Sequence, residues 1–446
     1  MEHKPNMYVV GGAVRSILLG ENPRDIDYVA VGFTAQQLID DGFQPVDAEF
    51  PVFIDPRDNS EVALARREKS TGKGYKDFTT DTSDVTLEED LKRRDLTINA
   101  MAIDSDKNII DPFGGQEDLQ RKILRHTSEA FFEDPVRVLR LARFQAKYPS
   151  FRIHESTIDL IREHKDRLLH LTPERIYKEM YKAMETNHPS LYFKTLDFLG
   201  VLSIVHPELQ AMKECIQKPT HHFESDVFQH SMMVLEECCK ITQDIPTRFG
   251  ALYHDIAKPI SDVKKQGFHK GHDGINLVQP LVDDLKARYR LPNIVTKKIL
   301  QGALYHMKLH KLKDMNSSTI ASMFNDKYFP KNKKDFIDLL CISTADSRGR
   351  ITIGYKKEEI NADAMISTFN AIKAYSPQNE ILEYNERHKE EGKTAHPDLI
   401  KQMIHRYSIK CVDAWLKPAL DFVRDTRTIH SYEVYSTDGH NVQRLN

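Results

Sequence analysis

The amino-acid sequence predicts an α+β fold, in which a head containing a sheet is followed by a mainly helical remainder. Up to about Asp118, short β-rich runs such as "MYVV", "DYVAVG", "PVFID", "EVALAR" and "TINAMAID" alternate with helical patterns. After Asp134 the strand signals fade, and segments such as "PERIYKEMYKAMETN" show the 3.6-residue period of helices. A histidine-rich region from about His221 to Asp346 then indicates a separate helical domain.

The chain length implies several domains. Its 446 residues exceed what one hydrophobic core usually organises, so about three or four domains are expected. We place a head at residues 1–140, a helical neck and body at 141–220, the histidine-rich domain at 221–350 and a helical tail at 351–446. The net charge of -3 means that local basic patches, not a global field, must hold any polyanionic partner.

The composition also indicates the cellular compartment in which we expect the protein. The five cysteines are odd in number and lack CxxC spacing, which argues against a disulfide framework and a thiolate zinc site, and favours the cytoplasm. We find no signal peptide and no run near the roughly 20 apolar residues that span a bilayer, so no membrane partner is expected. We expect a monomer or a homodimer.

The stretch "RDIDYVAVG", residues 24–32, places two acids at the entrance to an apolar run. In a strand, Asp25 and Asp27 would project from one face while Ile26 points into the core. Adjacent carboxylates are unfavourable unless they are hydrated or bridged by a cation, and Mg²⁺ accepts such oxygen ligands beside substrate phosphates. For an isolated pair, a solvated strand end is the favoured interpretation, so the surrounding residues must decide.

Just upstream, "MYVVGGAVRSILLG" predicts a strand, a turn at Gly11 and Gly12, and a helix closed by Gly20. Such a turn lets backbone N–H groups approach a phosphate, and Arg15 adds a cation one turn into the helix. Tight turns need glycine for backbone reasons alone, so the pattern gains weight only from the neighbouring acids.

Together, "GGAVR" and "RDIDYVAVG" resemble the head motif of the polymerase-beta-like nucleotidyltransferases, specifically class II tRNA nucleotidyltransferases (CCA-adding enzymes) and bacterial poly(A) polymerases. The resemblance implies a head with a small mixed sheet, a catalytic pair Asp25 and Asp27 that holds Mg²⁺, and nucleotide binding by Gly12 and Arg15. The family normally has an acid after that arginine, whereas this chain has Ser16.

A second string, "EEDLKRRDLTINAMAID", is similar to the second head motif of the family. The resemblance implies that Arg94 binds the nucleotide phosphates and that Asp95 lies near the ribose. As an isolated "RRD", the string would be read as a basic helix end before a strand.

In "FFEDPVRVLRLARFQAKY", Asp134 has a good N-cap position, Pro135 suits the first turn, and Arg137, Arg140 and Arg143 form a stripe. The stripe alone fits a solvated basic face. However, the string matches the family's EDxxR motif, which implies that Asp134 and Arg137 act as a template for the base, while Arg140 and Arg143 bind the triphosphate. Cytosine and adenine both offer an amino donor beside a ring-nitrogen acceptor, which a carboxylate and a guanidinium can satisfy.

The segment "ALARREKSTGKGYKDF" predicts a mobile basic loop between strands of the head. Its cations are Arg66, Arg67, Lys69, Lys73 and Lys76. In the family, a flexible loop here accompanies the switch from CTP to ATP and favours full CCA addition. The poly(A) polymerases usually carry a "GRRF"-like segment, where this chain has "AEFPVFIDP".

The histidine-rich region resembles an HD phosphohydrolase. The residues that carry the resemblance are His230, His254, Asp255, His272, His306 and Asp346. Such a set suits a divalent transition metal, nickel being one candidate, that activates water against a phosphoester. His-Asp pairs arise easily among 20 histidines, but a charged Asp255 in the apolar helix "GALYHDIAK" would be costly without a partner.

The combination resembles the multifunctional bacterial members of the CCA-adding family. It implies template-independent addition and repair of the 3′-terminal CCA of tRNA with CTP and ATP, and an HD domain that hydrolyses 3′-phosphate or 2′,3′-cyclic phosphate ends. The alternatives are a poly(A) polymerase and an HD phosphohydrolase with an RNA-binding head; a non-catalytic RNA-binding protein is disfavoured. The resemblance thins after Arg350, and the tail has no interpretation.

Overall fold

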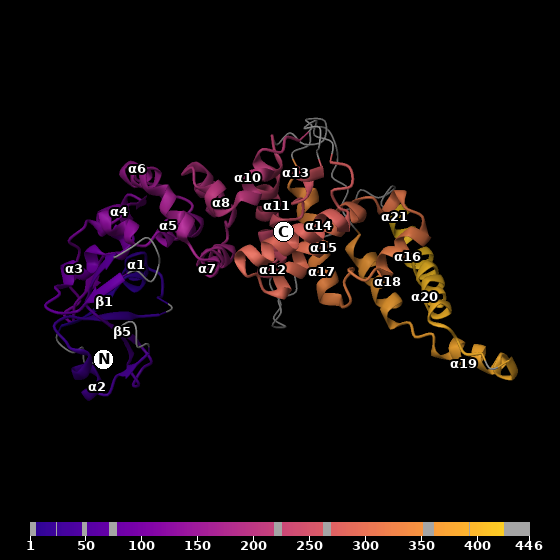
Figure 1. The fold of residues 1–446 in the computed structure, drawn as a ribbon, viewed down its shortest axis with the longest axis horizontal. Helices are drawn as coiled ribbons and strands as arrows, with labels where there is room; N and C mark the ends of the chain where they lie inside the picture. Colours follow the sequence, from indigo (N-terminus) through magenta and orange to yellow (C-terminus); the bar gives the residue numbers. More distant parts are fainter. Residues whose placement is uncertain are drawn as a thin grey trace. The chain divides into compact units, whose positions relative to one another are not determined.

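The computed structural model divides the chain into two compact units, Met1–Pro207 and Glu208–Asn446, each with its own core (Figure 1). The structure describes residues 6–23, 25–46, 51–70, 78–217, 225–261, 269–350, 361–391 and 393–422. The predicted α+β class is confirmed, since a mixed sheet near the N-terminus is followed by helices. The four domain boundaries drawn from the sequence remain predictions.

A seven-stranded mixed sheet organises the first unit, in the order β3-β4-β5-β2-β1-β8-β9. Its strands are β1 (Met7–Val10), β2 (Asp27–Ala30), β3 (Gln44–Pro45), β4 (Val52–Ile54), β5 (Glu61–Leu64), β8 (Ala102–Ile103) and β9 (Ile109–Ile110). Strands β2 and β5 are parallel, and the other neighbours are antiparallel. The register pairs Asp27 with Glu61, so two acids meet at the same end of the central strands.

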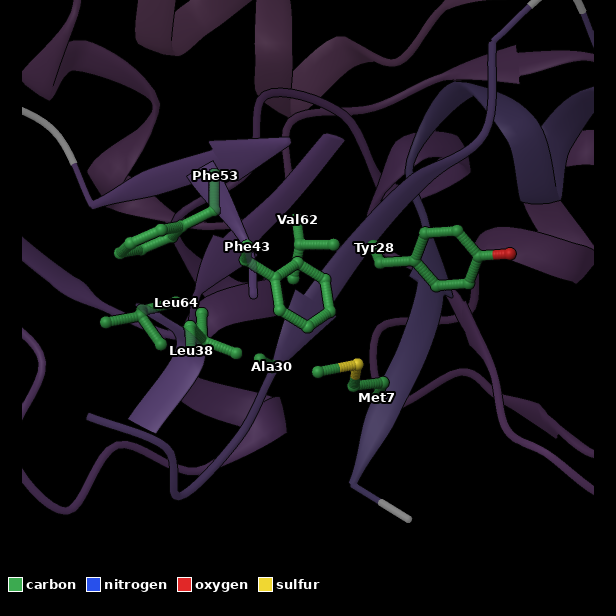
Figure 2. Close-up of a cluster of buried hydrophobic side chains, with 8 residues drawn as sticks. All are labelled: Met7, Tyr28, Ala30, Leu38, Phe43, Phe53, Val62 and Leu64. Atoms are coloured by element: carbon green, nitrogen blue, oxygen red, sulfur yellow. The ribbon is translucent and has the colours of Figure 1, made fainter. Parts of the chain in front are cut away.

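Both faces of this sheet are covered by apolar side chains. Tyr28 and Ala30 belong to a cluster completed by Leu38 of helix α2 (Ala35–Asp40), as Figure 2 shows. Val29 points to the opposite face, where it joins a second cluster with Val10. Because successive side chains of β2 point to opposite faces, the strand contributes to two core layers. Burial of each large apolar side chain contributes about 1.5–3 kcal/mol to stability.

The helices of the first unit build the neck and surround the sheet. They are α1 (Gly12–Leu18), α3 (Leu87–Lys92), η1 (Thr97–Asn99), α4 (Gly115–Gln120), η2 (Glu129–Glu133), α5 (Val136–Lys147), α6 (Glu155–His164), η3 (Lys165–His170), α7 (Pro173–Met184), α8 (Ser190–Phe198) and α9 (Leu202–Val205). A short parallel pair, β10 (Ile123–Leu124) and β11 (Arg152–Ile153), joins the two sides of α5.

Two segments of the head differ from the expectation. The start of "TINAMAID" forms the 3₁₀ turn η1, and only Ala102–Ile103 joins the sheet, because Thr97 and Asn99 make local turn hydrogen bonds. The two ends of the basic segment predicted as a loop include β6 (Arg67–Ser70) and the start of β7 (Phe78–Asp81), which pair antiparallel, and residues 71–77 between them lie outside the described residues. Lys73 and Lys76 lie outside the described residues, as does the side chain of Lys69.

The second unit is helical throughout its described part. Its elements are α10 (Pro207–Lys213), α11 (Val227–Ile241), α12 (Ile245–Leu252), α13 (Lys258–Ser261), α14 (Ile275–Tyr289), α15 (Asn293–His310), η4 (Leu312–Asp314), α16 (Ser317–Asn325), α17 (Lys333–Arg348), α18 (Ala362–Ala374), α19 (Gln378–Arg387), η5 (Lys389–Glu391), α20 (Pro397–Cys411), the π-helical η6 (Val412–Leu416) and α21 (Lys417–Phe422). Within the described residues, no helix has the length and apolar character needed to cross a membrane.

Two glycines let helices α12 and α15 approach closely. A Cβ on Gly250 would lie 2.5 Å from Ile342 Cδ1 and 3.0 Å from the Lys298 carbonyl oxygen, and one on Gly302 would lie 3.1 Å from the Gly250 carbonyl oxygen. Helix α12 ends two residues before His254. The close crossing therefore fixes the position of α12 and of the His-Asp pair that follows its end.

The tail helices pack against the C-terminal part of this unit. Helix α20 lies beside α16 (Figure 1), and the ring of Phe369 on α18 stacks on Phe336, with centroids 4.6 Å apart. In the part of the predicted tail that the structure describes, the longer helices are α18, α19 and α20. The polar C-terminal segment "YSTDGHNVQRLN" lies outside the described residues.

Candidate functional site

A cavity of about 830 Å³ opens in the first unit where β2, β5, α1, α5 and α7 meet. Of the ten head residues predicted from the sequence, all but Asp25 line this cavity. Eleven lining residues are basic and five are acidic. The basic ones are Arg15, Arg66, Arg93, Arg94, Arg137, Arg140, Arg143, Lys147, Arg175, Lys178 and Lys182. This excess of positive charge fits a polyphosphate ligand.

The acids lie at one end of the cavity. Strand β2 begins at Asp27, and Asp25 lies in a bend before it, so the expectation that strand alternation aligns the two acids is wrong. Burial raises the pKa of Asp27, Asp25 adds to this rise, and Arg94 opposes it. Burial, followed by Asp27, also raises the pKa of Glu61, which the sequence analysis missed. Three mutually repelling carboxylates are a donor set that suits Mg²⁺.

The glycine turn and Arg94 adjoin these acids. Gly11 has φ of 70°, a backbone conformation that favours glycine, and a Cβ there would lie 3.0 Å from Arg94 Nη1. Arg94 Nη2 donates to Asp90 Oδ2 at 3.0 Å, while Arg94 Nε is buried without an acceptor. A buried N–H without an acceptor costs about 1–3 kcal/mol, which a bound anion would relieve.

Arg15 is held between the sheet and the neck. Its Nε donates to Tyr148 Oη at 3.1 Å, its Nη1 donates to Asn99 Oδ1, and its guanidinium lies 4.9 Å from the Phe144 ring centroid. The neighbouring Ser16 is buried. Arg15 therefore links helix α1 to helix α5.

Two further arginines of α5 are fixed by buried carboxylates. Arg140 Nε donates to Asp95 Oδ2 at 2.8 Å, and Arg143 Nε donates to Glu179 Oε2 at 2.6 Å. Burial by itself raises the pKa of Asp95, but Arg140 and the amide of Asn99 outweigh it and hold this pKa far below the usual range. Asp95 is thus anchored to Arg140 as well as lining the cavity.

Asp134 and Arg137 stand at the start of α5. The helix begins at Val136 with Pro135 as N-cap, so Asp134, the predicted N-cap, lies one residue before the observed one. Its Oδ1 still accepts from Val136 N–H at 3.1 Å. The Arg175 guanidinium donates two hydrogen bonds, of 2.8 and 2.6 Å, to the same carboxylate. Arg137 Nη1 donates to the Ala130 carbonyl at 2.7 Å. The sequence analysis gave Arg175 no role.

All six predicted HD residues converge in the second unit. They are His230 on α11, His254 and Asp255 between α12 and α13, His272 before α14, His306 on α15 and Asp346 on α17. His254 and Asp255 lie in a turn after α12, whereas the sequence predicted that the apolar helix would contain them. Every one of the six is buried.

The electrostatics of this cluster favour ionised carboxylates. Burial raises the pKa of Asp255, yet His254 and Lys258 outweigh it and hold this pKa well below the usual value. Burial also lowers the pKa of His306 to about 4, so this ring is neutral at pH 7. Burial lowers the pKa of His254 and of His272, but Asp255 outweighs it and raises both. Imidazoles beside ionised carboxylates are suitable ligands for a transition metal.

Three residues of the HD cluster were missed in the sequence. Lys258 Nζ lies 2.7 Å from Asp255 Oδ2. His310 Nε2 and Arg350 Nη2 each lie 2.7 Å from Asp346 Oδ2. Helical spacing on α15 places His310 four residues after His306, a signal that could have indicated it.

Comparisons with known proteins identify the family to which the chain is similar. Family models match residues 7–125 (poly A polymerase head domain), 150–213 (probable RNA and SrmB-binding site of polymerase A) and 227–350 (HD domain). A multifunctional CCA protein of Hahella chejuensis is 38% identical over 383 residues, which cover 84% of this chain and 90% of that protein.

Two solved structures share the fold. The Bacillus stearothermophilus CCA-adding enzyme in complex with CTP has a TM-score of 0.60 at 19% identity, covering 91% of this chain and 88% of that one. The Thermotoga maritima CCA-adding enzyme complexed with tRNA has a TM-score of 0.58 at 18% identity, covering 95% and 88%.

The head, the RNA-binding segment and the HD domain define a tRNA nucleotidyltransferase that carries a second, phosphohydrolase-type domain. The chain belongs to the family of multifunctional CCA proteins.

The ion pair between Asp95 and Arg140 gives a first testable prediction. Asp95→Asn should destabilise the head at pH 7 by about 1–3 kcal/mol, a range that allows for the partial exposure of Arg140. Since the folded-state pKa of Asp95 is depressed, its contribution is present above about pH 3.8 and is lost as the pH falls below that value. Thermal unfolding at pH 7 and pH 3 should therefore show a smaller deficit at pH 3. Asp106→Asn, at an exposed turn, is the control, and an equal deficit at both pH values would contradict the prediction.

Proposed function

We propose that this protein adds and repairs the 3′-terminal CCA of tRNA without a nucleic-acid template, using CTP and ATP. The observation that carries the proposal is that one cavity holds all the groups that the reaction needs. It is lined by the candidate metal ligand Asp27, by the candidate phosphate-binding residues Arg94 and Arg140, and by the candidates for base recognition, Asp134 and Arg137. The family membership and the titles of the CTP and tRNA complexes of its structural relatives support it.

Asp25 and Asp27, joined by Glu61, would hold Mg²⁺. When bound, the ion supplies neutralising charge to the phosphates and lowers the pKa of the attacking 3′-hydroxyl. Arg94, with its unpaired buried Nε, would bind the nucleotide phosphates beside the Gly12 turn. Arg140 and Arg143 use Nε for their carboxylate partners, which leaves the Nη groups for the triphosphate.

Base choice would rest on Asp134 and Arg137. The two hydrogen bonds from Arg175 fix the plane of the Asp134 carboxylate, so its remaining lone pairs have a set direction. The amino groups of cytosine and adenine can donate to them. Uracil and guanine present a carbonyl at the equivalent place, and each unpaired polar group costs about 1–3 kcal/mol.

The HD cluster would hydrolyse 3′-phosphate or 2′,3′-cyclic phosphate ends with a divalent transition metal, for which nickel is one candidate. The donor set of imidazoles and carboxylates supports a transition metal over Mg²⁺. Recognition of tRNA would rest on shape and phosphate contacts, because the enzyme must accept many sequences. The five free cysteines fit the cytoplasmic location that we propose.

The incorporation of nucleotides tests the head. With tRNA lacking its last three nucleotides, the protein should add C from CTP and complete CCA only when ATP is also present. Asp27→Asn should lower incorporation about a thousand-fold, which corresponds to about 4 kcal/mol of activation free energy. Asp106→Asn should leave it unchanged. Survival of incorporation in Asp27→Asn would refute the metal assignment, and long A tracts without C would indicate a poly(A) polymerase.

Base selection tests the role of Arg175. Arg175→Gln removes both hydrogen bonds that orient Asp134, so the preference for C and A over U and G should fall about tenfold. The ratio of kcat/KM for each nucleoside triphosphate measures this preference. Arg121→Gln, which loses only an exposed helical ion pair with Glu117, should keep the wild-type ratios. Equal losses for all four nucleotides would instead assign Arg175 a purely structural role.

Hydrolysis of RNA ends tests the HD domain. His254→Ala removes a buried nitrogen ligand, so release of phosphate from an RNA ending in a 2′,3′-cyclic or 3′-phosphate should fall below detection. His170→Ala, an exposed histidine of the first unit, is the matched control. Wild-type hydrolysis by His254→Ala would contradict the assignment.

A further inference from the structure

One arginine of the cavity is buried without a carboxylate partner. Arg15 forms no ion pair with any described residue, and its hydrogen bonds go to two neutral groups, Tyr148 Oη and Asn99 Oδ1. Three other arginines of the cavity are compensated by buried acids: Arg94 by Asp90, Arg140 by Asp95 and Arg143 by Glu179. A buried cation without a counter-ion is costly, so Arg15 carries a charge that an anionic ligand would compensate.

Two aromatic rings hold the Arg15 guanidinium in place. Phe144 and Tyr148 lie one helical turn apart at the end of α5, and their rings stack with 6° between the planes and 6.5 Å between the centroids. The Arg15 guanidinium carbon lies 4.9 Å from the centroid of Phe144 and 5.7 Å from that of Tyr148. An aromatic face attracts a cation but has no net charge, so the rings fix the guanidinium without neutralising it.

The hydrogen bonds of Arg15 leave one of its nitrogens for a ligand. Nε donates to Tyr148 and Nη1 donates to Asn99, whereas Nη2 makes no hydrogen bond to a described residue. A Cβ placed on Gly12 would lie 3.5 Å from Nη2, so this nitrogen lies beside the glycine turn. Both Arg15 and Gly12 line the cavity, and Nη2 is therefore the donor that a bound anion can reach.

The ring of Phe144 also supports a second arginine. The Arg143 guanidinium carbon lies 4.7 Å from its centroid, while Arg143 Nε donates to Glu179 at 2.6 Å. A planar ion held along one edge can still tilt about that edge, and the contact with the ring face restricts the tilt. Phe144 and Val136 are the only apolar side chains among the described residues that line the cavity. One aromatic residue of the wall thus contacts two cations.

We propose that Phe144 and Tyr148 are positioning residues, which hold Arg15 and Arg143 in the orientation that binds the triphosphate of the incoming nucleotide. They act through the two arginines and not on the reacting atoms. A carboxylate in their place would orient Arg15 but would also neutralise the charge that the phosphates need. This inference rests on the proposed function of the head and deepens it by assigning the residues that orient the phosphate-binding cations.

Binding of inorganic tripolyphosphate tests this role without catalysis. Phe144→Leu keeps an apolar side chain but removes the aromatic face, so it should weaken binding of tripolyphosphate and of CTP about tenfold each. Phe144→Tyr keeps the face and should stay within about twofold of the wild type. Tyr148→Phe removes only the hydroxyl that accepts from Arg15 and should weaken both ligands about threefold. Isothermal titration calorimetry of the full-length protein with Mg²⁺ measures these affinities.

Phe198→Leu is the matched control. Phe198 also has an arginine over its ring, with the Arg162 guanidinium carbon 5.8 Å from the centroid, but it is exposed and does not line the cavity. The control should leave both affinities unchanged. Thermal unfolding shows whether each variant is folded, and Tyr148→Phe keeps both rings, so the test does not depend on the folding of Phe144→Leu alone.

Steady-state kinetics separate positioning from a purely structural role. Phe144→Leu should raise the KM for CTP and for ATP about tenfold, change kcat less than about threefold and keep the wild-type KM for tRNA. A general loosening of the head would instead lower kcat and raise the KM for tRNA as well. A fall in kcat with an unchanged KM for both nucleotides would overturn the positioning role.

The outcomes keep this inference apart from the proposed function. Equal affinity of the wild type and Phe144→Leu for tripolyphosphate would overturn the inference even if CCA addition is confirmed. Weaker binding of CTP with unchanged binding of tripolyphosphate would overturn it too, since the rings would then act on the base. The expected changes in binding, in a protein that adds no nucleotide, would support the positioning of a triphosphate and refute only the proposed addition of CCA.

Discussion

The basic cavity of the first unit depends on buried carboxylates that hold its arginines in place. Eleven basic side chains around one space repel one another, and long flexible cations would otherwise turn toward solvent. Asp90 pairs with Arg94, Asp95 with Arg140, and Glu179 with Arg143. The positive charge is therefore organised before any ligand arrives, which reduces the entropy lost on binding.

In the HD cluster the roles of the charges are reversed. Two buried carboxylates, Asp255 and Asp346, need partners that offset their negative charge, and helices from distant parts of the chain supply these partners. Helices α12 and α15 approach closely at Gly250 and Gly302. The backbone carbonyls of Ala251 and Gly302 contact the Nδ1 atoms of His254 and His306 and orient these two rings. In both sites the candidate ligand-binding side chains are oriented by buried carboxylates or by backbone carbonyls.

Much of the head could be predicted from the sequence because its functional residues lie in short, contiguous strings. The glycine turn, Arg94 and the start of α5 each carry a local pattern, and the structure brings nearly all of them to one cavity. Glu61 could not be found this way, since its place beside Asp27 follows from the pairing of β2 with β5. Arg175 likewise reaches Asp134 across 41 residues.

The errors in the prediction arose at the ends of elements, where local hydrogen bonds override periodicity. Asp25 lies in a bend before β2. The His-Asp pair lies in a turn after α12, where the N–H groups of Ile256 and Lys258 donate to the carbonyls of Tyr253 and Asp255. The six HD residues were identified as a group, but their contacts with the two oxygens of Asp255 depend on which way each ring faces. No spacing in the sequence carries that information.

The position of Arg15 has a consequence for the shape of the cavity. Because this side chain bonds Tyr148 and Asn99 at once, the glycine turn and helix α5 are joined as one piece. A shift of either would move the other, so the wall that they share resists local rearrangement. Under the proposed function, a change from CTP to ATP would then be made by parts of the site that lie outside this junction.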